Sequence, residues 1–86
     1  MNFIATSRFK RAYKSLPEEV KMGVKEALRM LAVNTRHPSL HVKKIKGTKD
    51  IWEARASLDC RITFQIVKDY FILRNVGRHD PTLKNP

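Results

Sequence analysis

Residues 51–67, IWEARASLDCRITFQIV, decide the fold because they alternate apolar and polar side chains on both sides of a turn near Asp59. The apolar positions are Trp52, Ala54, Ala56, Leu58, Ile62, Phe64 and Ile66. The polar positions between them include Glu53, Arg55, Arg61 and Thr63. Successive side chains of a strand point to opposite faces. The stretch therefore predicts two antiparallel strands, 51–58 and 61–67, each with one apolar and one polar face.

Two more strands are predicted outside this pair. Lys68 and Asp69 form a short turn that leads into residues 70–76, which complete a three-stranded meander. Near the start of the chain, residues 3–5, FIA, form a short apolar run bounded by Thr6 and Ser7. We expect this run to add to the sheet as an edge strand.

Two amphipathic helices are predicted between the first strand and the meander. The first has an apolar stripe at helical spacing, formed by Phe9, Ala12, Tyr13 and Leu16. Residues 15–18, SLPE, have the spacing of a capping box, so the second helix is expected to begin there. It continues through Val24 and Leu31, and Asn34 is expected as its left-handed end.

The predicted fold class is α+β, because helices and strands are segregated along the chain. The helical hairpin is expected to cover the apolar face of the sheet, and Glu53, Arg55, Arg61 and Thr63 to share the open face. At 86 residues the chain is long enough for a single domain spanning 1–86. Residues 47–50 are expected to be a connector, and residues 81–86 a short tail.

The charge balance points to a polyanionic partner. Lysine and arginine total 18 against 8 acidic residues, a net charge of +10, which suits nucleic acid or an acidic protein segment better than a membrane surface. No window approaches the roughly 18 consecutive apolar residues of a spanning helix, and residues 1–6 lack the basic leader of a signal peptide. A cytoplasmic protein is expected.

No metal site is predicted. Cys60 is the only cysteine, which rules out an intrachain disulfide and a multi-cysteine metal site, and we expect it to fill a turn or strand end. The three histidines, His37, His41 and His79, are far apart in sequence and lack the spacing of metal ligands.

Three charged residues of the two central strands form a candidate anion site. Glu53 and Arg55 are two positions apart and so point to one side of their strand, and Arg61 lies just across the turn. Opposed side chains of an antiparallel pair are about 5 Å apart, so the strand pairing brings Arg55 and Arg61 together. The two guanidiniums repel each other unless an anion lies between them. The arginine fork matches phosphate geometry. The alternative is that both arginines form ordinary ion pairs with Glu53 and Asp59.

The closing run VGRHD, residues 76–80, supplies a candidate proton donor or acceptor. His79 follows the last strand, and a histidine side chain titrates near neutral pH. Arg78 beside it is placed to contact a phosphate. The alternative is that His79 is an ordinary surface histidine.

A basic rim is predicted from Lys43, Lys44 and Lys46, which alternate with Val42 and Ile45. Such lysines contact phosphates without reading sequence. The alternative is a solvated face that keeps a small domain soluble.

Together these pieces resemble the RelE/ParE superfamily of bacterial toxins from type II toxin–antitoxin systems. The resembling features are the helical hairpin ending in Leu31 and, after it, HVKKIKG at 41–47, WEAR at 52–55, RITF at 61–64 and VGRHD at 76–80. The likeness covers nearly all of the chain. It implies a RelE-like fold of order β-α-α-β-β-β, with the two-helix hairpin on one face of a small, mainly antiparallel sheet.

The resemblance also implies a function and its residues. Such toxins are endoribonucleases that cut messenger RNA, in many members at the ribosomal A site, without metal or small-molecule cofactor, and a cognate antitoxin neutralises them. Arg61 matches the phosphate-binding arginine, Arg55 a basic catalytic position, and His79 the position of the general acid. Glu53 stands where many members have lysine and becomes the candidate general base. Asp80 has no assigned role.

Two other functions remain open at this point. A ParE-like protein poisons DNA gyrase by binding, although such members usually lack the arginine and histidine set. A binding module could also have kept the fold and lost the activity.

Overall fold

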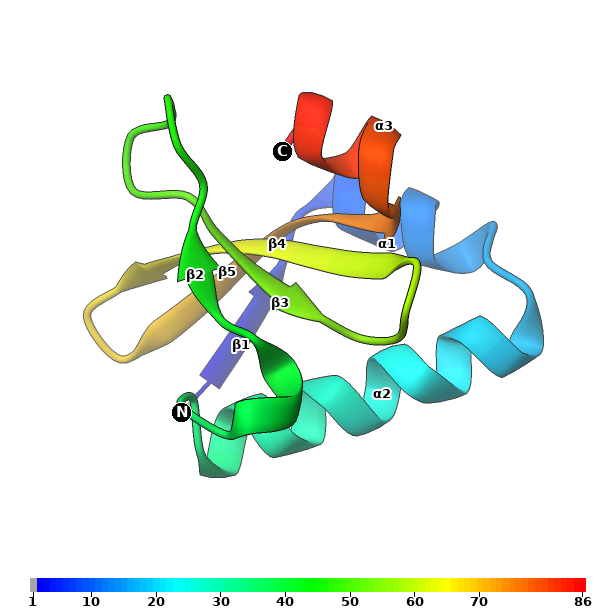
Figure 1. Cartoon of the computed structure of the whole chain (residues 1–86), viewed down its shortest axis with the longest axis horizontal. Helices are drawn as coiled ribbons and strands as arrows, with labels where there is room; N and C mark the ends of the chain where they lie inside the picture. Colours follow the sequence, from blue (N-terminus) through cyan, green and yellow to red (C-terminus); the bar gives the residue numbers. More distant parts are fainter. Residues whose placement is uncertain (1) are drawn as a thin grey trace.

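The computed structural model describes residues 2–86, which form one mixed sheet with helices on both of its sides. The elements are β1 (Asn2–Ala5), α1 (Ser7–Lys14), α2 (Glu18–Val33), the short 3-10 helix η1 (Pro38–Leu40), β2 (Lys43–Lys44), β3 (Trp52–Arg55), β4 (Cys60–Val67), β5 (Tyr70–Arg78) and α3 (His79–Lys84). Figure 1 shows the sheet between α2 on one side and α3 on the other. No described helix is long and apolar enough to cross a membrane.

The sheet has five strands in the order β1-β5-β4-β3-β2. Strand β1 runs parallel to β5 at one edge, and the other neighbours are antiparallel. The predicted α+β class, the meander and the N-terminal edge strand are confirmed. An irregularity between Thr63 and Phe64 shifts the register of β4 against β5.

The hydrophobic core lies between the sheet and the helices α1 and α2. From the sheet it takes Ala54, Ile62, Phe64, Phe71, Leu73 and Val76, and from the helices Phe9, Val24, Ala27 and Leu31. Phe64 and Phe71 meet edge to face with ring centroids 5.4 Å apart, a favoured aromatic geometry. The alternation in residues 52–64 thus selects the buried face as predicted.

The helix ends differ from the sequence prediction at two places. The backbone N–H of Ser15 still donates to Arg11, and its hydroxyl donates to the carbonyl of Ala12, so Ser15 closes α1 and cannot cap α2. Helix α2 begins at Glu18 after Pro17, which makes no side-chain cap. The predicted capping box is therefore wrong. Asn34 is extended, with φ −149°, not left-handed, because its side chain accepts from the N–H of Arg36 instead.

The predicted open face and C-terminal tail are also wrong. Residues 79–84 form α3, and the chain after it lies over the polar face of the sheet, where Thr63 Oγ1 and Arg74 Nε both donate to the Pro86 carbonyl. Thr63 is consequently buried, and Glu53 of the neighbouring strand β3 is buried as well. Gly77 permits the close packing, because a Cβ there would lie 2.9 Å from Thr82 Oγ1.

The predicted strand pattern also ends early at two points. Strand β3 stops at Arg55, and the following residues turn, so Leu58 is 80% exposed instead of buried. At the far end of β4, Ile66 is 41% exposed because it lies beyond the part of the sheet that the helices cover. The connector at residues 47–50 is confirmed as a turn, and Gly47 adopts φ +78° there.

Candidate functional site

Glu53 and Arg61 form a mostly buried ion pair on the sheet face that packs against α3. Arg61 Nε lies 3.7 Å from Glu53 Oε1, and Glu53 is only 6% exposed. Arg61 Nη1 also donates to three carbonyls at the β3–β4 turn, those of Ser57 at 2.9 Å, Leu58 at 3.2 Å and Cys60 at 3.2 Å. These bonds fix the guanidinium, because a planar fork with several acceptors has little freedom left.

Arg55 lies directly opposite Arg61 in the β3–β4 register, as the sequence predicts. No carboxylate of residues 2–86 lies within ion-pair distance of Arg55, so this second guanidinium lacks a counter-charge among them. Arg55 also lines a groove of about 450 Å³ beside α2, together with Glu26 and His41. Only Arg61 of the two opposed arginines has a carboxylate partner, so net positive charge remains at this end of the strand pair and favours an anion.

His79 begins α3 and is anchored to the same turn. Its backbone N–H donates to the Asp59 carbonyl at 2.8 Å. Its imidazole Nδ1 lies 2.7 Å from Asp80 Oδ1, and the side chain is 44% exposed. A carboxylate only accepts, so Nδ1 carries a proton and Nε2 is the nitrogen that can exchange one with a ligand.

No role was predicted for Asp80 from the sequence, and the structure places its carboxylate against the imidazole of His79. The hydrogen bond from His79, followed by the charge of His79, holds the pKa of the Asp80 carboxyl below its ordinary value. An ionised carboxylate on Nδ1 fixes the tautomer of the imidazole. Asp80 is exposed and its carboxylate contacts the imidazole of His79, so we regard it as a residue that positions this ring.

The strand register places His79 near the two arginines without a direct contact. Arg61 pairs with Gly77 of β5, and Cys60 pairs with Arg78, so His79 follows directly after the last paired residue. Within residues 2–86, no hydrogen bond or ion pair joins the His79 side chain to Glu53, Arg55 or Arg61.

The alternative reading, that the arginines pair with Glu53 and Asp59, holds in part. Glu53 pairs with Arg61, but Asp59 pairs with Arg78 instead, with Nε 3.0 Å from Oδ2. Arg78 is exposed, so this bond is weak in water. Arg78 thus stays available at the surface beside His79, where the sequence placed a phosphate contact.

The three predicted lysines lie along the β2 edge of the sheet, at the other end of the strand order from β1. Lys43 pairs with Glu53 and Lys44 with Trp52 in the β2–β3 register, and Lys46 follows in the exposed connector. Lys44 Nζ lies 2.9 Å from Asp50 Oδ1, and this hydrogen bond lowers the pKa of the Asp50 carboxyl. Lys43 and Lys46 have no ion pair in the described part of the chain, and they extend the basic surface beside β3.

The Cys60 side chain lies in the core, on the face toward α1 and α2, and takes no part in this site. Burial raises the pKa of its thiol, which keeps it neutral and unreactive at pH 7. Within residues 2–86, no three side chains of histidine, cysteine, aspartate or glutamate gather as they would around a metal ion.

Sequence reasoning missed the element that covers the site. Helix α3 had a signal in the sequence, because Asp80 and Pro81 suit the first turn of a helix and Lys84 suits its last turn. The segment is short and polar, without an apolar stripe, so periodicity does not reveal it.

Sequence comparisons give no match, because no family model fits the chain and no curated protein resembles it significantly. Solved structures do resemble it. YafQ from E. coli strain BL21(DE3) has a TM-score of 0.79 at 13% identity, covering 94% of this chain and 96% of its own. The YoeB/ParE toxin from Agrobacterium tumefaciens has a TM-score of 0.77 at 12% identity, covering 92% and 99%.

A third solved structure aligns with this chain over the full length of each. It is the RelB-RelE antitoxin-toxin complex from Methanococcus jannaschii, with a TM-score of 0.70 at 21% identity and 100% of each chain covered. These likenesses confirm the predicted RelE-like fold.

Proposed function

We propose that this chain is the toxin of a type II toxin–antitoxin system and that it cleaves messenger RNA. The observation that carries the proposal is the buried Glu53–Arg61 ion pair on the α3 face. Arg55 lies opposite Arg61 in the β3–β4 register without an ion pair among the described residues, and His79 follows at the end of β5. Two guanidiniums can bind a phosphate, and a carboxylate and an imidazole can exchange protons with it.

The proposed reaction is attack of the RNA's own 2′-hydroxyl on the adjacent phosphorus. Glu53 takes the proton of the 2′-hydroxyl as the new O–P bond forms. His79 gives the proton on Nε2 to the departing 5′-oxygen as the old O–P bond breaks. The products are a 2′,3′-cyclic phosphate and a 5′-hydroxyl.

Arg61 and Arg55 supply the electrostatic part. The negative charge on phosphate oxygens rises in the transition state, and a donor fixed in advance stabilises it without reorganising. Arg61 is fixed by the Ser57, Leu58 and Cys60 carbonyls. Arg55 has no competing carboxylate among the described residues, so its charge is available to the phosphate.

The proposed partners follow from charge and from the neighbours. A structural neighbour was solved as a RelB-RelE antitoxin-toxin complex, which supports a cognate antitoxin for this chain. The net charge of +10 supports binding to a polyanion such as messenger RNA. We propose that this RNA is bound in the ribosomal A site, in the cytoplasm. Lys43, Lys44, Lys46 and Arg78 are the proposed phosphate contacts outside the reacting group.

The test is to map RNA 5′ ends after brief induction of the chain in bacterial cells. The variants are Arg61→Ala and His79→Ala, and the matched control is Arg11→Ala, which removes the same charge from an exposed position of α1. We expect new ends in messages with the unchanged chain and with Arg11→Ala. Loss of Arg61 should reduce cleavage by about 100-fold or more, the usual effect of removing a transition-state donor.

Two outcomes would contradict the proposal. Equal RNA breaks with Arg61→Ala and His79→Ala would show that these side chains do not carry the reaction. Intact messages together with DNA breaks would point to a gyrase poison instead.

The role of Glu53 has its own test. If Glu53 is the base, Glu53→Gln lowers the cleavage rate and removes the acid limb of the pH–rate profile of purified protein. A lower rate with an unchanged acid limb would mean that Glu53 only positions Arg61.

A further inference from the structure

A pocket of about 480 Å³ opens on the other face of the sheet, at the edge that α2 does not cover. Its lining comes from the loop after α2 and from β3 and β4, and consists of Thr35, Arg36, His37, Pro38, His41, Val42, Trp52 and Ile66. The volume falls within the range of small-ligand sites, roughly 300–1,000 Å³. None of the lining residues was assigned to the proposed cleavage site.

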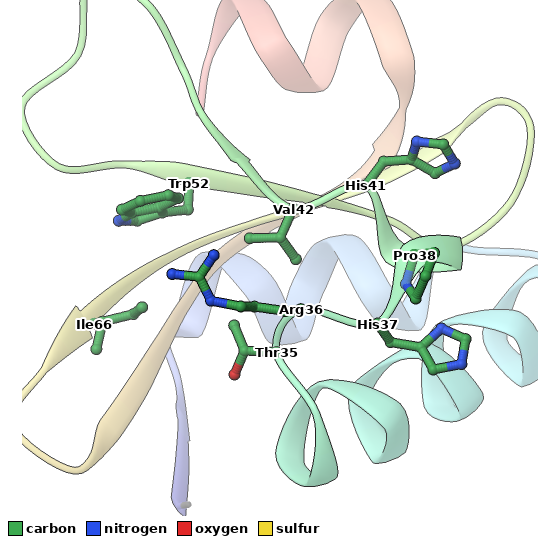
Figure 2. A pocket seen from close by; sticks show the side chains of 8 residues that line it. All are labelled: Thr35, Arg36, His37, Pro38, His41, Val42, Trp52 and Ile66. Atoms are coloured by element: carbon green, nitrogen blue, oxygen red, sulfur yellow. The ribbon is translucent and has the colours of Figure 1, made fainter.

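Trp52 forms one wall of this pocket. It is the only tryptophan of the chain, and it is half-buried because it packs against the edge of the core. Its register partner on β4 is Phe64, which places Ile66 diagonally beside it on the same face. Figure 2 shows Val42, Arg36 and Ile66 around the indole. A partly open indole beside aliphatic side chains suits a flat, aromatic ligand.

Arg36 supplies the charge of the pocket. Figure 2 shows its guanidinium between Trp52 and Thr35, whereas the rings of His37 and His41 point away from Trp52. The Nδ1 of His37 is also occupied, since it accepts from the N–H of Ser39. No carboxylate lines the pocket, and none in residues 2–86 forms an ion pair with Arg36. The free cation is therefore the arginine.

We propose that this pocket binds one nucleotide of single-stranded RNA, with its base against Trp52 and its phosphate on Arg36. An aromatic face beside an unpaired guanidinium is the pairing with which proteins hold single-stranded nucleic acid. A peptide side chain would fit the apolar wall, but an acidic segment is the only kind that would also use Arg36.

The pocket is separate from the proposed cleavage site. Neighbouring residues of a strand point to opposite faces, so Trp52 faces the pocket whereas Glu53 faces α3. A bound strand would run around the β2–β3 edge, where Lys43 and Lys46 lie. The inference rests on the proposed function only in taking RNA as the partner.

The test is a titration of the intrinsic fluorescence of Trp52, which needs no second reporter because the chain has no other tryptophan. The probes are adenosine 5′-phosphate, ribose 5-phosphate and a 2′-O-methyl adenosine trinucleotide, which cannot be cleaved by 2′-hydroxyl attack. We expect saturable quenching by the two probes with bases, tighter for the trinucleotide, and none by ribose phosphate. Arg36→Ala should weaken trinucleotide binding by about tenfold or more, as expected for loss of a charge-assisted hydrogen bond. Arg11→Ala should bind as the unchanged chain does.

Each other outcome overturns the inference. Equal binding of ribose phosphate would reduce the pocket to an anion site without stacking. Trinucleotide binding no tighter than that of the mononucleotide would remove RNA as the ligand. Quenching by an acidic aromatic peptide, with none by nucleotides, would make it a protein-docking site. Because the titration involves no cleavage, a failed cleavage assay leaves its result unchanged, and the two proposals can fail separately.

Discussion

The two faces of the sheet are both buried beside β4, but by different chemistry. On the face toward α1 and α2, β4 presents Ile62 and Phe64, which are fully buried among other apolar side chains. On the face toward α3, the same strand presents Arg61 and Thr63, beside Glu53 of β3. Arg61 and Thr63 donate there to backbone oxygens of the β3–β4 turn and of Pro86, and Glu53 is paired with Arg61.

Along β4, the side chains that stabilise the fold thus alternate with the side chains on the face of the proposed chemistry. Apolar burial stabilises the fold without directional bonds. Charged groups held away from water cost free energy unless they are paired, and on this face Arg61 is paired with Glu53. The face toward α1 and α2 therefore stabilises the fold, and the face toward α3 holds the candidate reactive groups.

The largest expected effect on stability comes from the face of the sheet toward α1 and α2. Phe64→Ala removes a fully buried ring and should lower the free energy of unfolding by about 3–5 kcal/mol. Thr63→Ala, on the other face of the same strand, loses a bond to the Pro86 carbonyl and should cost only about 1 kcal/mol. Urea unfolding followed by circular dichroism measures both. Equal costs would remove the contrast between the faces.

The ion pair on the α3 face should show the cost of an unpaired buried charge. Arg61→Ala leaves Glu53 without its cation and should lower stability by about 1–3 kcal/mol. Adding Glu53→Gln removes the stranded charge, so the double variant should recover part of the loss. A double-mutant cycle from the same unfolding curves gives the coupling. Strictly additive losses would show that the two side chains do not interact.

Two glycines sharpen the comparison because they should respond with opposite signs. At Gly77 a Cβ would lie 2.9 Å from Thr82 Oγ1, so Gly77→Ala should displace α3 and lower stability by about 1–3 kcal/mol. At Gly23 in α2 a Cβ would meet its nearest atom, the Ala56 carbonyl oxygen, at an ordinary 3.5 Å. Gly23→Ala should therefore raise stability by about 0.5–1 kcal/mol through helix propensity. Thermal unfolding of the two variants decides this, and a stable Gly77→Ala would mean that α3 packs loosely.

The smallest effect concerns Cys60. Burial raises the pKa of this thiol, so the folded state stays neutral at a pH where the unfolded chain has begun to ionise. Stability from this group is complete below the ordinary thiol pKa and declines as pH rises through it. A thiol reagent at pH 8 should therefore react with the native chain far more slowly than in 6 M urea. Equal rates would show that this strand end opens readily.

The sequence predicts the face toward α1 and α2 well because apolar alternation is a local signal. The same alternation places Arg55 opposite Arg61, since the turn near Asp59 sets the register. The cover over Glu53 and Thr63 was not predictable in this way. It depends on the absence of a side chain at Gly77 and on contacts between residues far apart in the chain, such as Thr63 with Pro86. The position of the end of α2 at Asn34 was predicted correctly, but its left-handed conformation was not, and the Asn34 side chain bonds locally to the N–H of Arg36.

The candidate site was predicted as a set of residues but not as a geometry. The ion pair of Arg61 with Glu53 was one of two readings left open by the sequence, and the pairing of Asp59 with Arg78 was not foreseen. The contact between His79 and Asp80 depends on side-chain rotamers at the start of α3, which no sequence pattern specifies. The pocket at Trp52 was missed because periodicity assigns this residue to the core.

The most direct test of the proposed chemistry is to identify the ends of RNA cut by the purified chain in a translating extract. Cleavage by 2′-hydroxyl attack on the α3 face predicts a 2′,3′-cyclic phosphate and a 5′-hydroxyl at each break. These products should be lost with Arg61→Ala and retained with Arg11→Ala. Breaks with 5′-phosphate ends, or equal amounts of product from Arg61→Ala, would contradict the assignment of this face as the reactive one.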